Sequence, residues 1–264
     1  MLVGASMRVP FHLVQARRNR LAGLLQQHQY LPLSELCSQL RVSEATARRD
    51  LAALARERVI TRTHGGALCE FNQRFPPFRE RLFRHPEAKR RIALAARNLI
   101  KPRMTCYFDS GTTTFAIAEA LAKHPVMPLV AVTNNLPVAE LLSRVDGVEV
   151  NLLGGQYLAR QSILVGETAR RSLRLWKLDI AFLAAEGMTA KGIWNSQLDV
   201  VQFQLAALER SRHAIFCLDS SKLNQEAAHF LVPWSKVHRL LTDAPLNGLS
   251  SAGITLKRSQ LITA

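Results

Sequence analysis

Apolar residues near the N-terminus recur every three or four positions, which is the spacing of amphipathic helices. The pattern predicts helices over residues 14–27, 33–40 and 44–54. Only residues 41–43 separate the last two helices. These two are therefore expected to form a tight helix-turn-helix.

The third of these helices has one apolar face and one polar face. Ser43 is suited to cap it, because its hydroxyl can accept from backbone N–H groups of the first turn. The apolar stripe consists of Ala47, Leu51 and Leu54. The residues off this stripe, which are expected to point outward, are Glu44, Thr46, Arg48 and Arg49. Such a helix fits the major groove of DNA, where arginines meet the acceptor groups of guanine. The alternative, from this stretch alone, is an ordinary amphipathic surface helix.

A β-branched run follows at residues 59–63 and leads into two glycines at 65–66. It predicts a hairpin with a narrow basic tip, the shape of a wing beside a DNA groove. Arg62 and His64 are expected to contact phosphate or the minor groove. Residues 1–67 are therefore expected to form a winged helix-turn-helix DNA-binding domain.

Strand and helix patterns alternate in the rest of the chain. Residues 68–86 contain three prolines and many arginines and are expected to form a linker. Helices are predicted at 87–100, 112–122, 136–143 and 197–210, and strands at 104–109, 129–133, 148–153, 179–184, 213–218 and 237–242, with a short edge strand at 253–256. This alternation indicates an α/β domain over residues 87–264, built on a mainly parallel sheet that is covered on both faces.

Ligands of open parallel sheets bind at the carboxyl ends of the strands, and here several of these ends are polar. The first such end, which leads directly into a helix, consists of Asp109, Ser110, Gly111, Thr112, Thr113 and Thr114. Because helix N-termini bind anions, this segment is expected to hold a phosphate group. The alternative is simple capping of the helix, which needs only one hydroxyl.

Other candidate ligand residues lie at neighbouring strand ends or on the helices that follow. They are Asn134, Asn135, Gly154, Gly155, Glu186, Asp199 and Lys222. The asparagine pair and the glycine pair are each also consistent with a plain turn. Lys222 is placed either to neutralise a phosphate or to lie in solvent.

The chain is strongly basic, with 35 Lys and Arg residues against 20 Asp and Glu and a net charge of +15. Residues 1–100 hold 18 basic against 7 acidic side chains, and residues 101–264 hold 17 against 13. The excess therefore lies with the helix-turn-helix, which favours nucleic acid as a partner over a merely solvated basic face. Proteins of this kind commonly bind two half-sites, so a homo-oligomer (dimer or tetramer) on double-stranded operator DNA is expected.

Cysteine usage and hydropathy narrow the class further. The 4 cysteines include no CxxC pair, so no metal site, disulfide framework or cofactor is expected. No apolar run is long enough to span a bilayer. The apolar segment 1–10 precedes the arginines at 17–20, which is the reverse of a secretory signal. A cytoplasmic protein without a membrane partner is expected.

Two sets of motifs resemble one protein family. VSEATARRDLAAL followed by ITRTHGGA resembles the DNA-binding signature of the DeoR family of bacterial transcriptional regulators. FDSGTTT, VTNN and LLGG, in this order, resemble the effector domain of the same family. The resemblance covers residues 15–242. It implies a fold similar to ribose-5-phosphate isomerase and a phosphorylated sugar or related metabolite as effector. The sequence departs from the family at Ala184-Ala185-Glu186-Gly187, where Gly-Thr-Asp-Gly is usual, and at Leu205, where lysine is common.

The leading interpretation is a repressor of carbohydrate-metabolism genes that is controlled by this effector and is not an enzyme. The alternative is an active sugar-phosphate isomerase or deaminase with an accessory DNA-binding domain. Isomerisation needs a base, an acid and a group that stabilises the enediolate, and the sequence offers no complete set. A protein that merely coats DNA would have no use for a ligand pocket.

Overall fold

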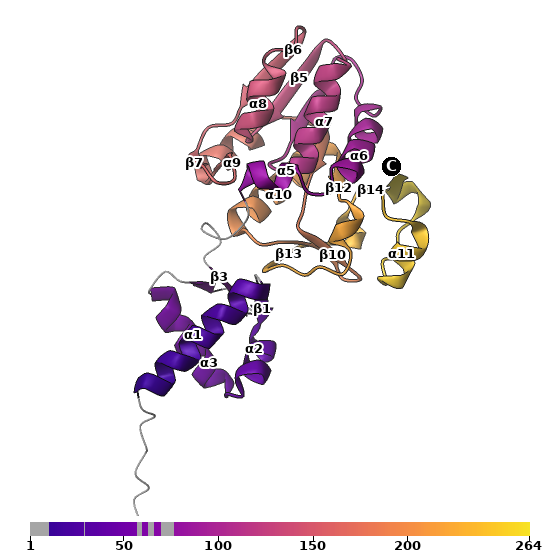
Figure 1. Ribbon diagram of the computed structural model, residues 1–264. Helices are drawn as coiled ribbons and strands as arrows, with labels where there is room; N and C mark the ends of the chain where they lie inside the picture. Colours follow the sequence, from indigo (N-terminus) through magenta and orange to yellow (C-terminus); the bar gives the residue numbers. More distant parts are fainter. Residues whose placement is uncertain (1–10, 29, 57–59, 63–65, 70–76) are drawn as a thin grey trace, which may run out of the picture. The chain divides into compact units, whose positions relative to one another are not determined.

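The computed structural model describes residues 11–28, 30–56, 60–62, 66–69 and 77–264. The chain divides into two compact units, Met1–Phe75 and Pro76–Ala264 (Figure 1). No helix in these ranges is long and apolar enough to cross a bilayer.

The first unit contains three helices and a small antiparallel sheet in its described residues. Its elements are α1 (Phe11–His28), β1 (Tyr30–Pro32), α2 (Leu33–Leu40), α3 (Glu44–Arg56), β2 (Ile60–Arg62) and β3 (Gly66–Cys69). Strand β3 lies between β1 and β2 and is antiparallel to both. The three expected helices and the antiparallel pairing of the hairpin strands are confirmed, while the expected tip at residues 63–65 lies outside the described residues. Strand β1, which ends in Pro32, was not expected.

The connection between α2 and α3 is short and well defined. Arg41 adopts the left-handed conformation (φ 52°), and its N–H donates to the carbonyl oxygen of Ser38 at 3.3 Å. The N–H of Val42 donates to the carbonyl oxygen of Cys37 at 3.1 Å. These bonds end α2 and reverse the chain before α3 begins, so the expected helix-turn-helix is confirmed.

The second unit is built on a seven-stranded sheet. Its strands, in sheet order, are β15 (Leu261–Thr263), β14 (Arg239–Thr242), β12 (Ser211–Cys217), β9 (Leu178–Leu183), β4 (Thr105–Phe108), β5 (Leu129–Thr133) and β6 (Val148–Leu152). Every neighbouring pair is parallel. The structure thus confirms the expected α/β class, with a sheet more uniformly parallel than the sequence required.

Helices cover both faces of this sheet, as Figure 1 shows. The helices are α5 (Phe78–Leu82), α6 (Pro86–Arg97), α7 (Thr112–Lys123), α8 (Leu136–Leu142), α9 (Glu167–Arg174), α10 (Leu198–Arg210) and α11 (Leu246–Ser251), with 3-10 turns η1 (Ser220–Lys222), η2 (Trp234–Lys236) and η3 (Arg258–Gln260). Helices α6, α7 and α8 pack on one face, around Phe108 and Phe182. Helices α9, α10 and α11 pack on the other, around Tyr107 and Phe216. Burial on both faces explains why the strands are almost continuously apolar.

Two smaller sheets complete the unit. Strands β7 (Gln156–Leu158) and β8 (Ile163–Val165) form a hairpin, and β10 (Gly187–Thr189), β11 (Gly192–Asn195) and β13 (His229–Pro233) form an antiparallel sheet. The edge strand expected at residues 253–256 was wrong. Gly253 has a φ of +69° where the chain leaves α11, and Ile254 is buried in the core rather than paired. The strand next to β14 at that edge of the sheet is β15, and β6 lies at the other edge.

Candidate functional site

Helix α3 carries the outward-facing residues that the sequence indicated. Its first-turn N–H at Thr46 donates to the hydroxyl of Ser43 at 3.4 Å, as expected of an N-cap. The stripe of Ala47, Leu51 and Leu54 is buried. Of the residues off the stripe, Glu44, Arg48 and Arg49 are exposed and Thr46 is half-buried. A basic face with a capped N-terminus is therefore available to a partner.

The structure describes contacts of the α3 arginines and only part of the predicted wing. Arg48 Nη2 lies 3.3 Å from Glu44 Oε2, an exposed pair of the kind that contributes little stability. Arg49 makes no ion pair with any described residue. Arg62 lies in β2, where its backbone pairs with Ala67 of β3. His64 lies outside the described residues.

A buried carboxylate holds α3 against α1, and the sequence pattern had not singled it out. Asp50 is 2% exposed. Its Oδ2 accepts from Arg17 Nε at 2.6 Å, and its Oδ1 accepts from Arg18 Nε at 3.1 Å. A carboxylate at a core position of an amphipathic helix was the available signal, because such a group needs a charged partner.

The carboxyl ends of five neighbouring strands place most of the candidate ligand residues along one edge of the sheet. Strands β12, β9, β4, β5 and β6 are consecutive in the sheet and parallel, so the segments that follow them start side by side. In this order, the segments carry Lys222, Glu186, the run from Asp109 to Thr114, the pair Asn134 and Asn135, and the pair Gly154 and Gly155.

Asp109 is the centre of a buried hydrogen-bond network. It is 1% exposed. Its Oδ2 accepts from Gln204 Nε2 at 2.6 Å and from the N–H of Ala184 at 3.1 Å, and its Oδ1 accepts from the Ser110 hydroxyl at 3.3 Å and from the Tyr107 hydroxyl at 3.4 Å. Burial raises the pKa of Asp109, while the bond from Gln204 acts in the opposite direction. The carboxylate thus fixes the conformation of the chain at the end of β4.

Gly111 and Thr114 fix the turn into α7. A Cβ added at Gly111 would lie 2.3 Å from Ala184 Cβ, so the end of β9 occupies the space that any other residue would need. The hydroxyl of Thr114 lies 2.6 Å from the carbonyl oxygens of both Asp109 and Gly111. No side chain caps α7 within the described part of the chain. Its first-turn N–H groups are therefore not satisfied by a capping side chain, and the first-turn residues Thr112 and Thr113 are buried.

Asn134 and Asn135 are both buried beside this turn. Asn134 Oδ1 accepts from the Tyr107 hydroxyl at 2.9 Å, which links β5 to the network around Asp109. Asn135 Oδ1 accepts from the N–H of Val138 at 3.1 Å and caps α8. Its Nδ2 is buried, and no described group accepts from it. A buried amide donor of this kind is costly unless water or a ligand supplies an acceptor.

Glu186 lies among opposite charges at the next strand end. It is half-buried, and its Oε2 accepts from the Ser196 hydroxyl. Burial raises the pKa of Glu186, and the bond from Ser196 together with the positive charges of Arg81 and Lys222 opposes that rise. Lys222 is itself half-buried rather than fully in solvent. Burial lowers the pKa of Arg81 to about 10, while the charge of Glu186 acts to raise it.

Helix α5 is held against α6 by Lys89 and against α7 by Phe78. Lys89 is 6% exposed, and its Nζ lies 2.6 Å from the carbonyl oxygen of Arg81 and 3.5 Å from that of Leu82. These carbonyls end α5, where a positive charge is favourable. Burial lowers the pKa of Lys89 to about 8. The buried ring of Phe78 lies 5.6 Å from that of Phe115 near the start of α7.

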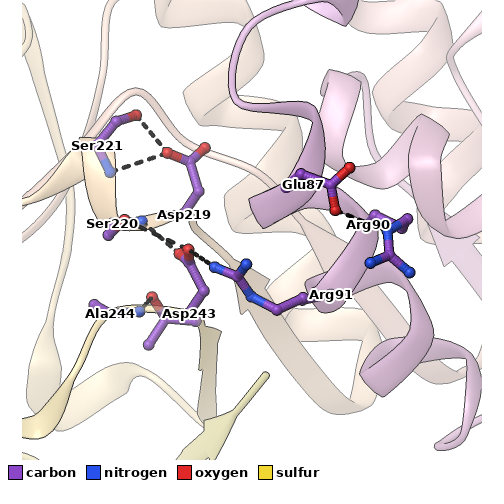
Figure 2. Close-up of polar contacts among 9 residues, drawn as sticks. Glu87, Arg90, Arg91, Asp219, Ser220, Ser221, Asp243 and Ala244 are labelled. Atoms are coloured by element: carbon purple, nitrogen blue, oxygen red, sulfur yellow. Dashed lines mark hydrogen bonds and ion pairs between the residues drawn. The ribbon is translucent and has the colours of Figure 1, made fainter.

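The segment that carries Lys222 is held by two aspartates. Asp219 accepts from the N–H of Ser221 at 3.0 Å. Asp243 accepts from the N–H of Ser220 at 2.7 Å, and Arg91 reaches it from α6 at 2.7 Å (Figure 2). The ends of β12 and β14 are thereby tied to α6.

Three predicted residues of the site are less closely joined to the rest. Asp199 is exposed in the first turn of α10, and among the described side chains no hydrogen bond or ion pair connects it to the Asp109 network. Gly154 and Gly155 are exposed as well. Gly155 has a φ of +144°, and a Cβ there would lie 2.5 Å from the carbonyl oxygen of Val165. A close approach to β8 therefore explains this glycine without a ligand.

The two units match known domains. Residues 17–72 match the DeoR-like helix-turn-helix domain, and residues 84–244 match the DeoR C terminal sensor domain. The chain is 33% identical over 230 residues to the glycerol-3-phosphate regulon repressor of Escherichia coli strain K12, which covers 87% of this chain and 90% of that protein. It is 30% identical over 247 residues to the putative aga operon transcriptional repressor of Escherichia coli O157:H7, which covers 90% of this chain and 91% of that protein.

Among solved structures, the chain is similar to ribose 5 phosphate isomerase A from Neisseria gonorrhoeae. The identity is 19%, the match covers 51% of this chain and 52% of that chain, and the TM-score is 0.36. A likeness of this size carries no conclusion about activity. The relatives that match along most of the chain are transcriptional regulators, not enzymes. The chain therefore belongs to the DeoR family of transcriptional regulators, with a helix-turn-helix domain that binds DNA and a C-terminal sensor domain.

Proposed function

We propose that this regulator represses genes of carbohydrate metabolism and that a phosphorylated sugar or related metabolite controls it. The effector's phosphate would lie at the N-terminus of α7, on Ser110, Gly111, Thr112 and Thr113. The observation that carries this proposal is the start of α7, where no described side chain caps the first-turn N–H groups and the first helical residues are threonines. At the neighbouring strand end, the buried Asn135 Nδ2 is a second donor for which no described group is an acceptor.

The surroundings of α7 support a binding site more than a catalytic one. The carboxylate oxygens of Asp109 accept hydrogen bonds from four donors of the same domain. Asp109 therefore fixes the conformation of the loop and is not a free general base. Glu186 and Lys222 follow the neighbouring strands β9 and β12 and supply groups of opposite charge for the rest of the ligand. The relatives' names suggest glycerol 3-phosphate as the first compound to try, followed by pentose and hexose phosphates.

Binding without turnover is the decisive measurement. The full-length protein is heated with each phosphate in turn, and the same mixtures are assayed for chemical change. A saturable rise in Tm with no conversion supports a sensor, because a ligand that binds only the folded state stabilises it. Conversion of the sugar phosphate would support the isomerase or deaminase alternative instead.

Thr113→Asp locates the phosphate. An aspartate in the first turn faces the positive end of the helix and occupies it, so the variant should fold and bind DNA but lose its response to the effector. Thr113→Ser keeps the hydroxyl and serves as the matched control. Gly111→Asp is unsuitable, because its Cβ would collide with Ala184 whatever the ligand does. A Thr113→Asp protein that responds to the effector as wild type does would place the phosphate elsewhere.

We further propose that the operator is read by Arg48 and Arg49, with Glu44 and Thr46 near base edges, Ser43 at the cap, and Arg62 and His64 on the wing. A homo-oligomer, dimer or tetramer, would then engage two half-sites. Mapping bound DNA across the source genome identifies the operator. The spacing of half-sites in that operator, together with light scattering of the protein, tests the oligomer.

A further inference from the structure

The Asp50 carboxylate organises two arginines at the side of the recognition helix. Asp50 lies one turn after Thr46 on α3, so both face the same flank of that helix. Arg17 and Arg18, which are adjacent on α1, each reach one carboxylate oxygen, at 2.6 Å and 3.1 Å. The Asp50 side chain is 3% exposed, whereas each arginine side chain is 21% exposed. The carboxylate is thus buried, while each arginine side chain keeps part of its surface exposed.

Both arginines bind Asp50 through Nε alone. A guanidinium carries five N–H donors, so each arginine keeps its four Nη donors. Within the described ranges, neither Arg17 nor Arg18 makes a second hydrogen bond or ion pair through those groups. The contact with Asp50 fixes the plane of each guanidinium, and a fixed fork loses less conformational entropy when it binds phosphate.

The charges of this cluster do not balance. Two guanidinium groups face one carboxylate, so among the described residues one positive charge at the α1–α3 junction has no acidic partner. In helix-turn-helix proteins the recognition helix lies in the major groove, so the phosphate backbone runs past its flanks. Arg–phosphate contacts are frequently bidentate and favour guanidinium over ammonium.

We propose that Arg17 and Arg18 are DNA-backbone contacts, each binding one phosphate through its Nη groups, and that Asp50 is the positioning residue that orients them. This inference rests on DNA binding by the helix-turn-helix domain and not on the effector. It stands or falls separately from the phosphate site at α7.

The salt dependence of DNA binding tests the proposal. Full-length protein is titrated with a random-sequence DNA duplex over a range of salt concentrations. The slope of log K against log salt changes by about 0.9 for each phosphate contact, so loss of both contacts should reduce it by about 1.8. Wild-type protein gives the reference slope and shows first that DNA is bound.

The variants are chosen so that the fold survives. Removing only the arginines would leave a buried carboxylate unpaired, which is strongly destabilising. Arg17→Met, Arg18→Met and Asp50→Leu are therefore combined, because replacement of a buried ionic cluster by apolar residues is often tolerated. Arg20→Gln is the matched control, since Arg20 is exposed on the same helix. The triple variant should lose about 1.8 in slope while Arg20→Gln retains the wild-type value. A triple variant with the wild-type slope, or a control that loses as much, would overturn the proposal.

A second variant tests positioning. Arg17→Lys combined with Arg18→Lys keeps the charge, but one ammonium cannot both pair with Asp50 and present a fixed fork to phosphate. The slope should fall as in the triple variant while the protein stays folded. A lysine variant that keeps the wild-type slope would show that charge alone suffices, and it would remove the role assigned to Asp50.

Discussion

Replacing Gln204 by Leu tests whether the effector loop depends on the hydrogen bonds beneath it. Gln204 is fully buried. Its Nε2 donates to Asp109 Oδ2 at 2.6 Å and to the carbonyl oxygen of Ala184, and its Oε1 accepts from Asn195 Nδ2 at 3.1 Å. Leucine fills a similar volume but leaves all three groups without this partner. A neutral bond contributes about 1 kcal/mol and a bond to a carboxylate about 1.5–3 kcal/mol. The free energy of unfolding should therefore fall by about 3–5 kcal/mol at neutral pH.

The loss should depend on pH, and the sign follows from Asp109. Burial raises the pKa of Asp109, and Gln204 provides the largest of the hydrogen bonds that hold it down. Without that donor the pKa rises further. An acid with a raised folded pKa favours the protonated form when folded, so its contribution is present at low pH and is lost as the pH rises through the folded value. The deficit of Gln204→Leu should thus be largest at neutral pH and smaller under acid conditions.

Urea unfolding followed by tryptophan fluorescence provides the assay. All 3 tryptophans, Trp176, Trp194 and Trp234, lie in the second unit, so the signal reports that unit alone. Asp109→Asn keeps the size of the side chain and removes its charge, so in that background Gln204→Leu should cost less. A deficit below about 1 kcal/mol, or one that is the same at every pH, would refute the reasoning.

Three further predictions concern single contacts. Arg49→Ala should weaken operator binding by about 1–3 kcal/mol and relax one base preference, whereas Arg48→Ala should cost less because Arg48 already pairs with Glu44; footprints that match wild type for both would contradict this. Gly111→Ala should lower the Tm because its Cβ meets Ala184 Cβ, and Ala184→Gly should restore the Tm in the double variant; absence of rescue would mean that another contact is responsible. Burial lowers the pKa of Lys89 to about 8, so between about pH 8 and pH 10 the unfolded chain binds a proton that the folded chain has released. The Tm of the wild type should therefore rise over this range, and the Tm of Lys89→Met should not.

The sequence predicted the main elements because their patterns are long and local. The apolar runs at 129–133 and 179–184 became β5 and β9, and the periodic segment at 44–54 became most of α3. Both are signals that burial imposes directly on the residues concerned. The short strands β7, β8, β10, β11 and β13 escaped notice because each has only three to five residues and β11 pairs with a strand far along the chain. No local periodicity records such a pairing.

The residues at the edge of the sheet were predicted from the sequence, but the buried hydrogen bonds that hold them were not. The order of the parallel strands brings Asp109, Asn134 and Glu186 to one edge, as the rule for open sheets implies. Gln204 was missed, although a polar residue on the inward stripe of an apolar helix is a signal of a buried hydrogen bond. The steric need for Gly111 could not be predicted, because its neighbour Ala184 follows another strand and only the folded chain brings the two together.

The packing of α5 against α6 and α7 determines where the chain can be truncated to produce the C-terminal domain alone. A sensor fragment that starts at residue 76 keeps Phe78 against Phe115 and keeps the carbonyl oxygens that receive Lys89. A fragment that starts at residue 87 loses both, which opens a hole beside the start of α7 and leaves a buried ammonium group without its acceptors. Ligand screens on the shorter fragment would report weak binding for a reason that has nothing to do with the ligand. The first residue of the fragment therefore decides whether a screen can identify the effector.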